Sequence, residues 1–130
     1  MKYYFAHPVT IYNTRKESVI IDMINKTGFL SNPWTLNPNS EYHEQFYKKE
    51  GMDYFLKLVD ECDSLVIYPF EDSTIGAGIA KEAQRAFDTK KRVYFINPSD
   101  FRMEEIYELK NILTVEETHE KIQQIKSLIK

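Results

Sequence analysis

Residues 62–82 have the sequence CDSLVIYPFEDSTIGAGIAKE, which combines three kinds of segment. The apolar run at 64–68 predicts a strand that is buried on both faces of a sheet. An acidic loop with hydroxyl and glycine residues follows, and then a helix that contains Glu82. In open α/β sheets, ligands bind beyond the carboxyl ends of the strands, where helix N-termini present free N–H groups. Asp72 in the loop and Glu82 in the helix are therefore candidate functional residues.

The rest of the chain alternates between strand-like and helix-like segments. We expect strands at 3–6, 29–31, 64–68 and 93–96, and an edge strand at 111–113. Helices are expected after capping boxes at 14–17 and 114–117, at 41–50 and 52–59, from 79 onward, and at 103–109, with Gly28 ending the first helix. The irregular stretch at 32–51 is interpreted as a lid over the strand ends. Together these segments predict one domain over 1–130, an α/β three-layer sandwich of the flavodoxin or Rossmann type with a mainly parallel sheet of four or five strands.

Composition narrows the class of protein. The 130 residues carry a net charge of −3, and this balance gives no sign of the excess positive charge with which proteins bind duplex nucleic acid. No apolar run approaches the roughly 20 residues that span a bilayer, and the N-terminus has no signal-peptide pattern. Cys62 is the single cysteine, and the three histidines form no ligand pattern, so we expect no metal and no cofactor. The prediction is a cytoplasmic protein that binds neither nucleic acid nor membrane.

Several motifs resemble those of the nucleoside 2-deoxyribosyltransferase-like family over about residues 3–98. The segment YYFAHPV at 3–9 resembles the opening strand of that family, and FLSNP at 29–33 resembles its second strand. Cys62 and Asp63 resemble the pair that opens the third strand. The loop before the helix glutamate matches through Asp72, Ser73, Gly76 and Gly78, and the spacing from Glu82 to Ala86 and Val93 also agrees.

The resemblance implies an enzyme that cleaves or exchanges the N-glycosidic bond of a (deoxy)nucleoside or of a nucleoside 5′-monophosphate. In the family, the helix glutamate attacks C1′ of the sugar, an aromatic residue of the first strand positions it, and a loop acid contacts the base or sugar. These roles fall on Glu82, Tyr4 and Asp72. The resemblance also implies a homo-oligomer. His7 stands where the family usually has glycine, so the resemblance does not identify the substrate.

Further candidates for substrate binding lie at the expected strand ends and in the glycine-containing loop. Hydroxyl and backbone N–H groups of the loop can cradle a sugar or a phosphate. The candidates are Ala6, His7, Ser73, Gly76, Gly78 and Asn97.

Five of the candidate site residues also have a purely structural interpretation. Glu82 can be a solvated helix residue paired with Arg85, and Asp72 can be a plain turn residue. Tyr4 can be a core aromatic, His7 a loop residue with satisfied hydrogen bonds, and Asn97 the cap of a turn. The alternative function is a non-catalytic module of the same fold that binds or senses a nucleotide.

Overall fold

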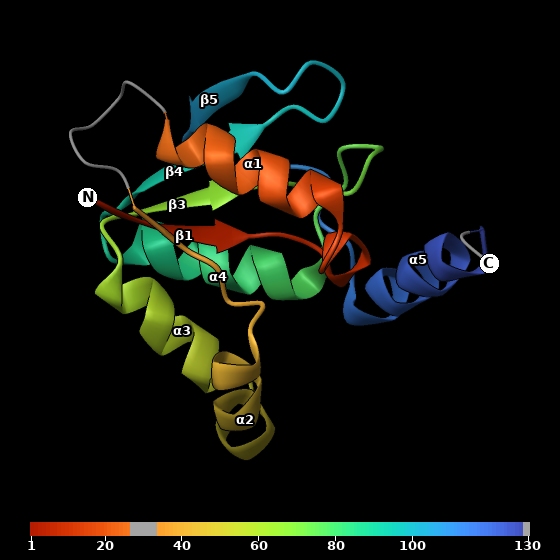
Figure 1. Cartoon of the computed structure of the whole chain (residues 1–130), viewed down its shortest axis with the longest axis horizontal. Helices are drawn as coiled ribbons and strands as arrows, with labels where there is room; N and C mark the ends of the chain where they lie inside the picture. The colour runs from red at the N-terminus through yellow and green to blue at the C-terminus, as the bar shows by residue number, and fades with distance from the viewer. Residues whose placement is uncertain (27–33, 129–130) are drawn as a thin grey trace.

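The computed structural model describes residues 1–26 and 34–128, which form a five-stranded sheet in the order β2-β1-β3-β4-β5 (Figure 1). Strands β1 to β4 are parallel, and β5 is antiparallel to β4. The strands are β1 Lys2–Ala6, β2 Trp34–Leu36, β3 Ser64–Ile67, β4 Arg92–Ile96 and β5 Met103–Ile106. The helices are α1 Arg15–Asn25, α2 Glu41–Glu50, α3 Met52–Glu61, α4 Ala77–Asp88 and α5 Val115–Leu128, with a 3-10 turn at Val9–Ile11.

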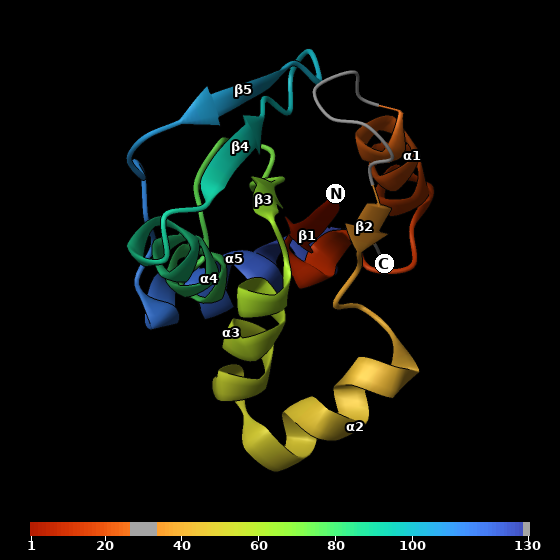
Figure 2. The same ribbon diagram turned by 90° about the vertical axis from the view of Figure 1, so that its left-hand side faces the viewer.

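Helices cover both faces of the sheet, which confirms the predicted three-layer α/β architecture (Figure 2). Successive side chains of a strand point to opposite faces. On β1, Tyr3 and Phe5 therefore pack with Ile20 and Ile24 of α1, whereas Tyr4 contributes to the core under α3 and α4. All four residues of β3 are buried, as the apolar run predicts for a central strand.

The second strand lies at a different place from the one expected. Trp34–Leu36 pairs with β1, and the Trp34 N–H donates to the Met1 carbonyl at 2.8 Å. This strand falls inside the stretch that we interpreted as irregular. Pro33 and Pro38 flank it in the sequence, and prolines so close together are more typical of a loop than of a three-residue strand. The expected strand at 29–31, the family-like FLSNP segment at 29–33 and the helix end at Gly28 lie outside the described residues.

The helix expected at 103–109 is wrong, because Met103–Ile106 is the strand β5. A tight turn after β4 reverses the chain: Phe101 has φ 58°, and its N–H donates to the Asn97 carbonyl at 2.8 Å. Residues 103–106 then pair with backbone groups at the edge of β4 that would otherwise be unpaired. The edge strand expected at 111–113 is also wrong, since that segment forms one isolated bridge, between Ile75 and Ile112.

The threonine caps of both expected capping boxes are confirmed, but only the box at 114–117 is complete, because the Glu17 carboxylate accepts from the Asn13 N–H and not from that of Thr14. The Glu17 N–H donates to Thr14 Oγ1 at 3.3 Å, and the Glu117 N–H donates to Thr114 Oγ1 at 3.1 Å. The second box is reciprocal, because the Thr114 N–H also donates to the Glu117 carboxylate at 3.0 Å. It starts α5, which extends away from the sheet at the end toward which the strands point (Figure 1).

The central strand gives a direct check of this fold. Leu65 is 0 % exposed, so Leu65→Ala should lower the free energy of unfolding by about 2–5 kcal/mol. Leu128 is 84 % exposed, and Leu128→Ala should change it by less than about 0.5 kcal/mol. Urea unfolding of the two variants measures the difference. Equal losses in both would contradict the buried position of β3.

Candidate functional site

A cavity of about 480 Å³ lies beyond the carboxyl ends of the parallel strands. Its walls come from the end of β1 and the loop after it, the loop after β2, α2, α3 and the first turns of α4 and α5. The strand order places β1 and β3 side by side where the chain connections change direction, which is where open α/β sheets bind ligands. The volume is in the range of small-molecule sites.

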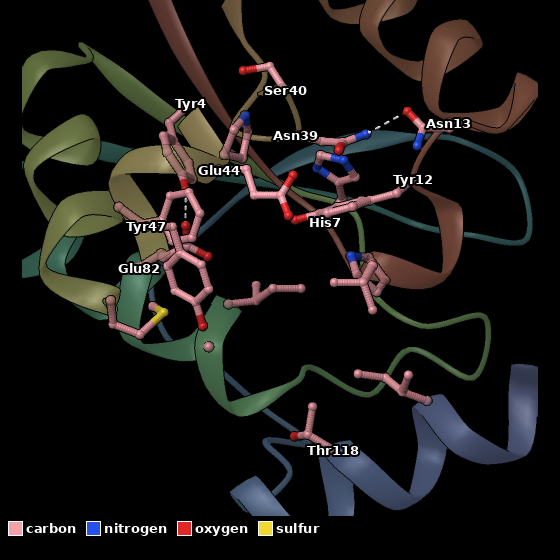
Figure 3. A pocket seen from close by; sticks show the side chains of 18 of the residues that line it. Tyr4, His7, Tyr12, Asn13, Asn39, Ser40, Glu44, Tyr47, Glu82 and Thr118 are labelled. Atoms are coloured by element: carbon pink, nitrogen blue, oxygen red, sulfur yellow. Dashed lines mark hydrogen bonds between the residues drawn. The ribbon is translucent and has the colours of Figure 1, made fainter. Parts of the chain in front are cut away.

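Tyr4 and Glu82 meet in this cavity. The buried face of α4 is formed by Ile79, Glu82, Ala83 and Ala86, so Glu82 occupies one position of an otherwise apolar helical row. Tyr4 points from β1 toward the same face, and its hydroxyl donates a hydrogen bond to Glu82 Oε2 (Figure 3). The expected pairing of these two residues is therefore present, and Tyr4 is at the same time a core aromatic that is 0 % exposed.

The environment of Glu82 makes it titratable near neutral pH. The side chain is 7 % exposed. Burial raises the pKa of its carboxyl to about 7, against the opposing effect of the Tyr4 hydrogen bond. Burial and the charge of Glu82 also raise the pKa of the Tyr4 hydroxyl, so that Tyr4 stays a hydrogen-bond donor. A carboxyl group of this kind in a cavity is a candidate for catalysis.

The alternative in which Glu82 is solvated and paired with Arg85 is wrong. Arg85 instead donates two hydrogen bonds to Asp60 of α3, at 2.8 and 2.7 Å. This bidentate pair links α3 to α4 on the outside of the protein. The carboxyl of Glu82 is therefore left to Tyr4 and to the cavity.

His7 lines the cavity, but its two ring nitrogens are engaged by the protein. Nδ1 lies 3.0 Å from the Phe5 carbonyl, and Nε2 lies 2.7 Å from Glu17 Oε2. The ring stacks on Phe5, with the centroids 4.0 Å apart. Tyr12 also packs against the ring, with the centroids 5.0 Å apart, and the side chain is 0 % exposed. These contacts match the alternative of a histidine with satisfied hydrogen bonds.

Asp72 lies outside this cavity and beside a second hollow, between α5 and the loop after β3. Its carboxylate forms an ion pair with Lys121 and accepts hydrogen bonds from the backbone N–H and hydroxyl of Thr74, at 3.1 and 2.6 Å. Lys121 and Thr74 together hold the pKa of Asp72 at about 2. The structure thus gives Asp72 the contacts of the turn alternative and does not bring it to Glu82.

The residues of the glycine-containing loop lie in different surroundings and do not form one site. Gly78 lines the cavity with Glu82, whereas Ser73 lines a third hollow, near β5. Gly76 caps α4, and a Cβ atom there would lie 3.1 Å from Thr118 Cγ2. The Thr118 hydroxyl accepts a hydrogen bond from the Ala77 N–H at 2.9 Å. The first turn of α4 therefore already has a hydroxyl partner from α5.

Two other predicted site residues lie away from Glu82. Ala6 is 1 % exposed and packs in the core, without lining the cavity. Asn97 caps the turn after β4: its side-chain oxygen accepts from the backbone N–H and the hydroxyl of Ser99, at 2.9 and 2.7 Å. This is the turn alternative for Asn97.

Several polar residues of the cavity were not predicted from the sequence. They follow β1 or β2 along the chain or lie on α2, and they are Tyr12, Asn13, Asn39, Ser40, Glu44 and Tyr47. Tyr12 lines the same cavity as Glu82, and burial together with the charge of Glu82 raises the pKa of its hydroxyl. Asn39, Ser40, Glu44 and Tyr47 belong to the predicted lid, and they do line the cavity. A strand predicted at 34–36 would have placed the residues after it at the strand ends, where the cavity lies.

Glu17 was expected only as part of a capping box, yet it organises one side of the site. It is 6 % exposed, and its carboxylate lies within hydrogen-bond distance of His7, of the Asn39 amide and of the Asn13 backbone N–H. Burial acts to raise the pKa of Glu17, but the hydrogen bonds from His7, Asn39 and Asn13 lower it below its ordinary value.

No group of His, Cys, Asp and Glu side chains that could hold a metal ion is present in the described parts of the chain, 1–26 and 34–128. Within the same ranges, no helix has the length and apolar character needed to cross a bilayer. The chain matches no protein-family model, no curated protein and no solved structure.

The buried carboxyl predicts a pH-dependent stability. Because the folded pKa of Glu82 lies near 7, above the ordinary value of 4.5, its neutral form stabilises the fold fully below pH 4.5. That contribution, on the order of 3 kcal/mol, is lost as the pH rises through 7. Glu82→Gln cannot ionise, so its free energy of unfolding relative to the wild type should increase from pH 5 to pH 8.

Urea unfolding at pH 5, 6, 7 and 8 measures this difference. The matched control is Glu120→Gln, the same substitution at an exposed residue of α5, whose stability should follow the wild type at every pH. Parallel curves for the wild type and Glu82→Gln would contradict the raised pKa.

Proposed function

We propose that the chain is an enzyme that cleaves or exchanges the N-glycosidic bond of a nucleoside, with Glu82 as its nucleophile. The observation that carries this proposal is the buried Glu82 carboxyl, with a pKa of about 7, bonded to Tyr4 in a cavity at the strand ends. The motif resemblance over residues 3–98 assigns the same two residues. A carboxyl buried in an apolar row costs stability, which favours a chemical role over a structural one.

The proposed reaction has two steps. The Glu82 carboxylate attacks C1′ of the sugar as the C1′–N bond breaks, and the base leaves with the electron pair of that bond. Tyr4 orients the carboxylate and favours its ionised form. Glu44, the second carboxyl group that lines the cavity, is 61 % exposed and paired with Lys48, and it is our candidate for passing a proton from solvent to the departing base. Water or a second base then attacks C1′ and frees Glu82, which gives hydrolysis or exchange.

The charges of the lining favour a nucleoside over a 5′-monophosphate. Among the described residues, the cavity is lined by Glu44 and Glu82 but by no lysine or arginine. Glu44 is paired with Lys48 at 3.5 Å, whereas no cation in the described parts of the chain pairs with Glu82, so a phosphate beside Glu82 would meet a carboxyl group without a counter-charge. In addition, Thr118 accepts the hydrogen bond from the Ala77 N–H, a group that a phosphate would otherwise use.

We leave Asp72 out of the catalytic set, because Lys121 and Thr74 engage its carboxylate outside the cavity. The homo-oligomer and the cytoplasmic location remain predictions. The alternative of a non-catalytic nucleotide-binding or sensing module shares the cavity and differs in the chemistry, so turnover separates the two functions.

Base release from a mixture of deoxynucleosides and their 5′-monophosphates, followed by mass spectrometry, provides the main experiment. We expect free base from the nucleosides, and a loss of at least about a thousandfold in Glu82→Gln, because the nucleophile is removed. Glu120→Gln, at an exposed residue of α5, should retain the wild-type rate. Binding without base release would support the sensing module, and an unchanged rate in Glu82→Gln would exclude Glu82 as the nucleophile.

The hydrogen bond between Tyr4 and Glu82 makes a second prediction. In the wild type, kcat/KM for base release should rise with pH through about 7, as Glu82 ionises. Tyr4→Phe removes a hydrogen bond that lowers this pKa, so the inflection should move upward by about one pH unit. Tyr107→Phe, at a residue that is 81 % exposed, is the matched control. An inflection that does not move in Tyr4→Phe would separate Tyr4 from the ionisation of Glu82.

A further inference from the structure

The cavity has a second polar cluster, made by His7, Asn13, Glu17 and Asn39. Tyr4 and Glu82 lie on one side of the pocket, and Asn13 and Asn39 lie on another, with Glu44 and Tyr12 between them (Figure 3). A nucleoside with its sugar at Glu82 would extend its base toward this cluster. The cluster is therefore in the place where a base would be recognised.

Glu17 is the centre of the cluster. Its Oε2 atom lies 2.7 Å from His7 Nε2 and accepts from Asn39 Nδ2 at 2.8 Å, and its Oε1 atom accepts from the Asn13 N–H at 3.1 Å. Three partners from three different segments thus hold a carboxylate that is almost completely buried. The lowered pKa of Glu17 keeps it ionised at neutral pH, and an ionised carboxylate can only accept hydrogen bonds.

The carboxylate fixes which way the Asn39 amide faces. Because Glu17 can only accept, Asn39 must turn its NH2 group toward it, and the same nitrogen also donates to Asn13 Oδ1 at 3.2 Å. The Asn39 side-chain oxygen has no hydrogen-bond partner among residues 1–26 and 34–128. Since Asn39 lines the cavity, this oxygen is the polar atom that it leaves for a ligand.

We propose that Glu17 is a positioning residue which holds Asn39 as an obligate hydrogen-bond acceptor, and that Asn39 selects bases carrying an exocyclic amino group. An asparagine that can rotate its amide by half a turn pairs equally well with a donor or an acceptor. An asparagine whose amide is fixed cannot adapt in this way. If its side-chain oxygen faces a carbonyl oxygen of the base, two acceptors meet and no hydrogen bond forms. The inference rests on the proposed function, because it takes the base of a nucleoside as the ligand.

Two pairs of ligands that differ only at the relevant group measure this selectivity. They are deoxyadenosine against deoxyinosine, and deoxycytidine against deoxyuridine, in each case an amino group against a carbonyl. Calorimetric titrations in the Glu82→Gln background give each Kd without consuming the ligand. For at least one pair, we expect the amino compound to bind about tenfold or more tightly.

Adding Asn39→Ala should bring that ratio to within about twofold of one. Adding Glu17→Gln should also lower the ratio, because glutamine offers either a donor or an acceptor and lets the Asn39 amide turn around. Asn25→Ala, the same asparagine-to-alanine change at an exposed residue outside the cavity, should leave the ratio unchanged. If Glu17→Gln does not fold, as judged by urea unfolding, Asn39→Ala decides alone.

Failure of this inference differs from failure of the proposed function. A ratio near one in the parent protein, a ratio that Asn39→Ala does not change, or no binding of any of the four nucleosides overturns the inference. Selective binding that depends on Asn39, with no base release by the wild-type chain, supports the inference as a recognition site and overturns only the proposed catalysis.

Discussion

The burial of one carboxyl group governs the rest of this site. Glu82 occupies a position on α4 where the helical row otherwise carries isoleucine and alanine, so folding removes an acid from water. Burial disfavours the charged form of Glu82, and a single hydrogen bond from Tyr4 stabilises that form. Tyr4 is itself held in place because it belongs to the paired strand β1. The balance leaves the pKa of Glu82 near 7, where a carboxyl group can change its charge during a reaction cycle. Packing alone would be better served by leucine at this position.

The topology explains why such different segments converge on Glu82. At the boundary between β1 and β3, the chain leaves the sheet in two directions, so that the loops after β1 and β2 and the start of α4 line one cavity. Glu17, at the start of α1, joins the first two of these loops through His7 and Asn39. One side of the cavity is therefore held by an ionised carboxylate with three partners, and the other by a titratable carboxyl with one.

The parts of the fold that were predicted from sequence are those with an unambiguous local pattern. The apolar run of β3, the helical row of α4 and the threonine caps of α1 and α5 each admit one interpretation. Trp34–Leu36 and Met103–Ile106 are short strands, and only pairing with β1 and β4 makes them so. The error at β2 propagated to the site, because Asn39 is recognisable as a strand-end residue only once β2 is in place. Asp72 and Asn97 were selected by chain position, but local hydrogen bonds to Thr74 and Ser99 engage both side chains.

The start of α4 shows how a second helix changes what a strand-end cavity can bind. A helix N-terminus beside a glycine is an anion site when its N–H groups are free. Here Gly76 has no side chain of its own to cap α4, and its lack of a Cβ lets Thr118 approach closely. The Thr118 hydroxyl then accepts the hydrogen bond from the Ala77 N–H, so α5 engages one of the N–H groups that an anion at this helix end would use. With that group engaged and two carboxyl groups in the lining, the electrostatics of the cavity disfavour phosphates and leave recognition to hydrogen bonds with neutral groups.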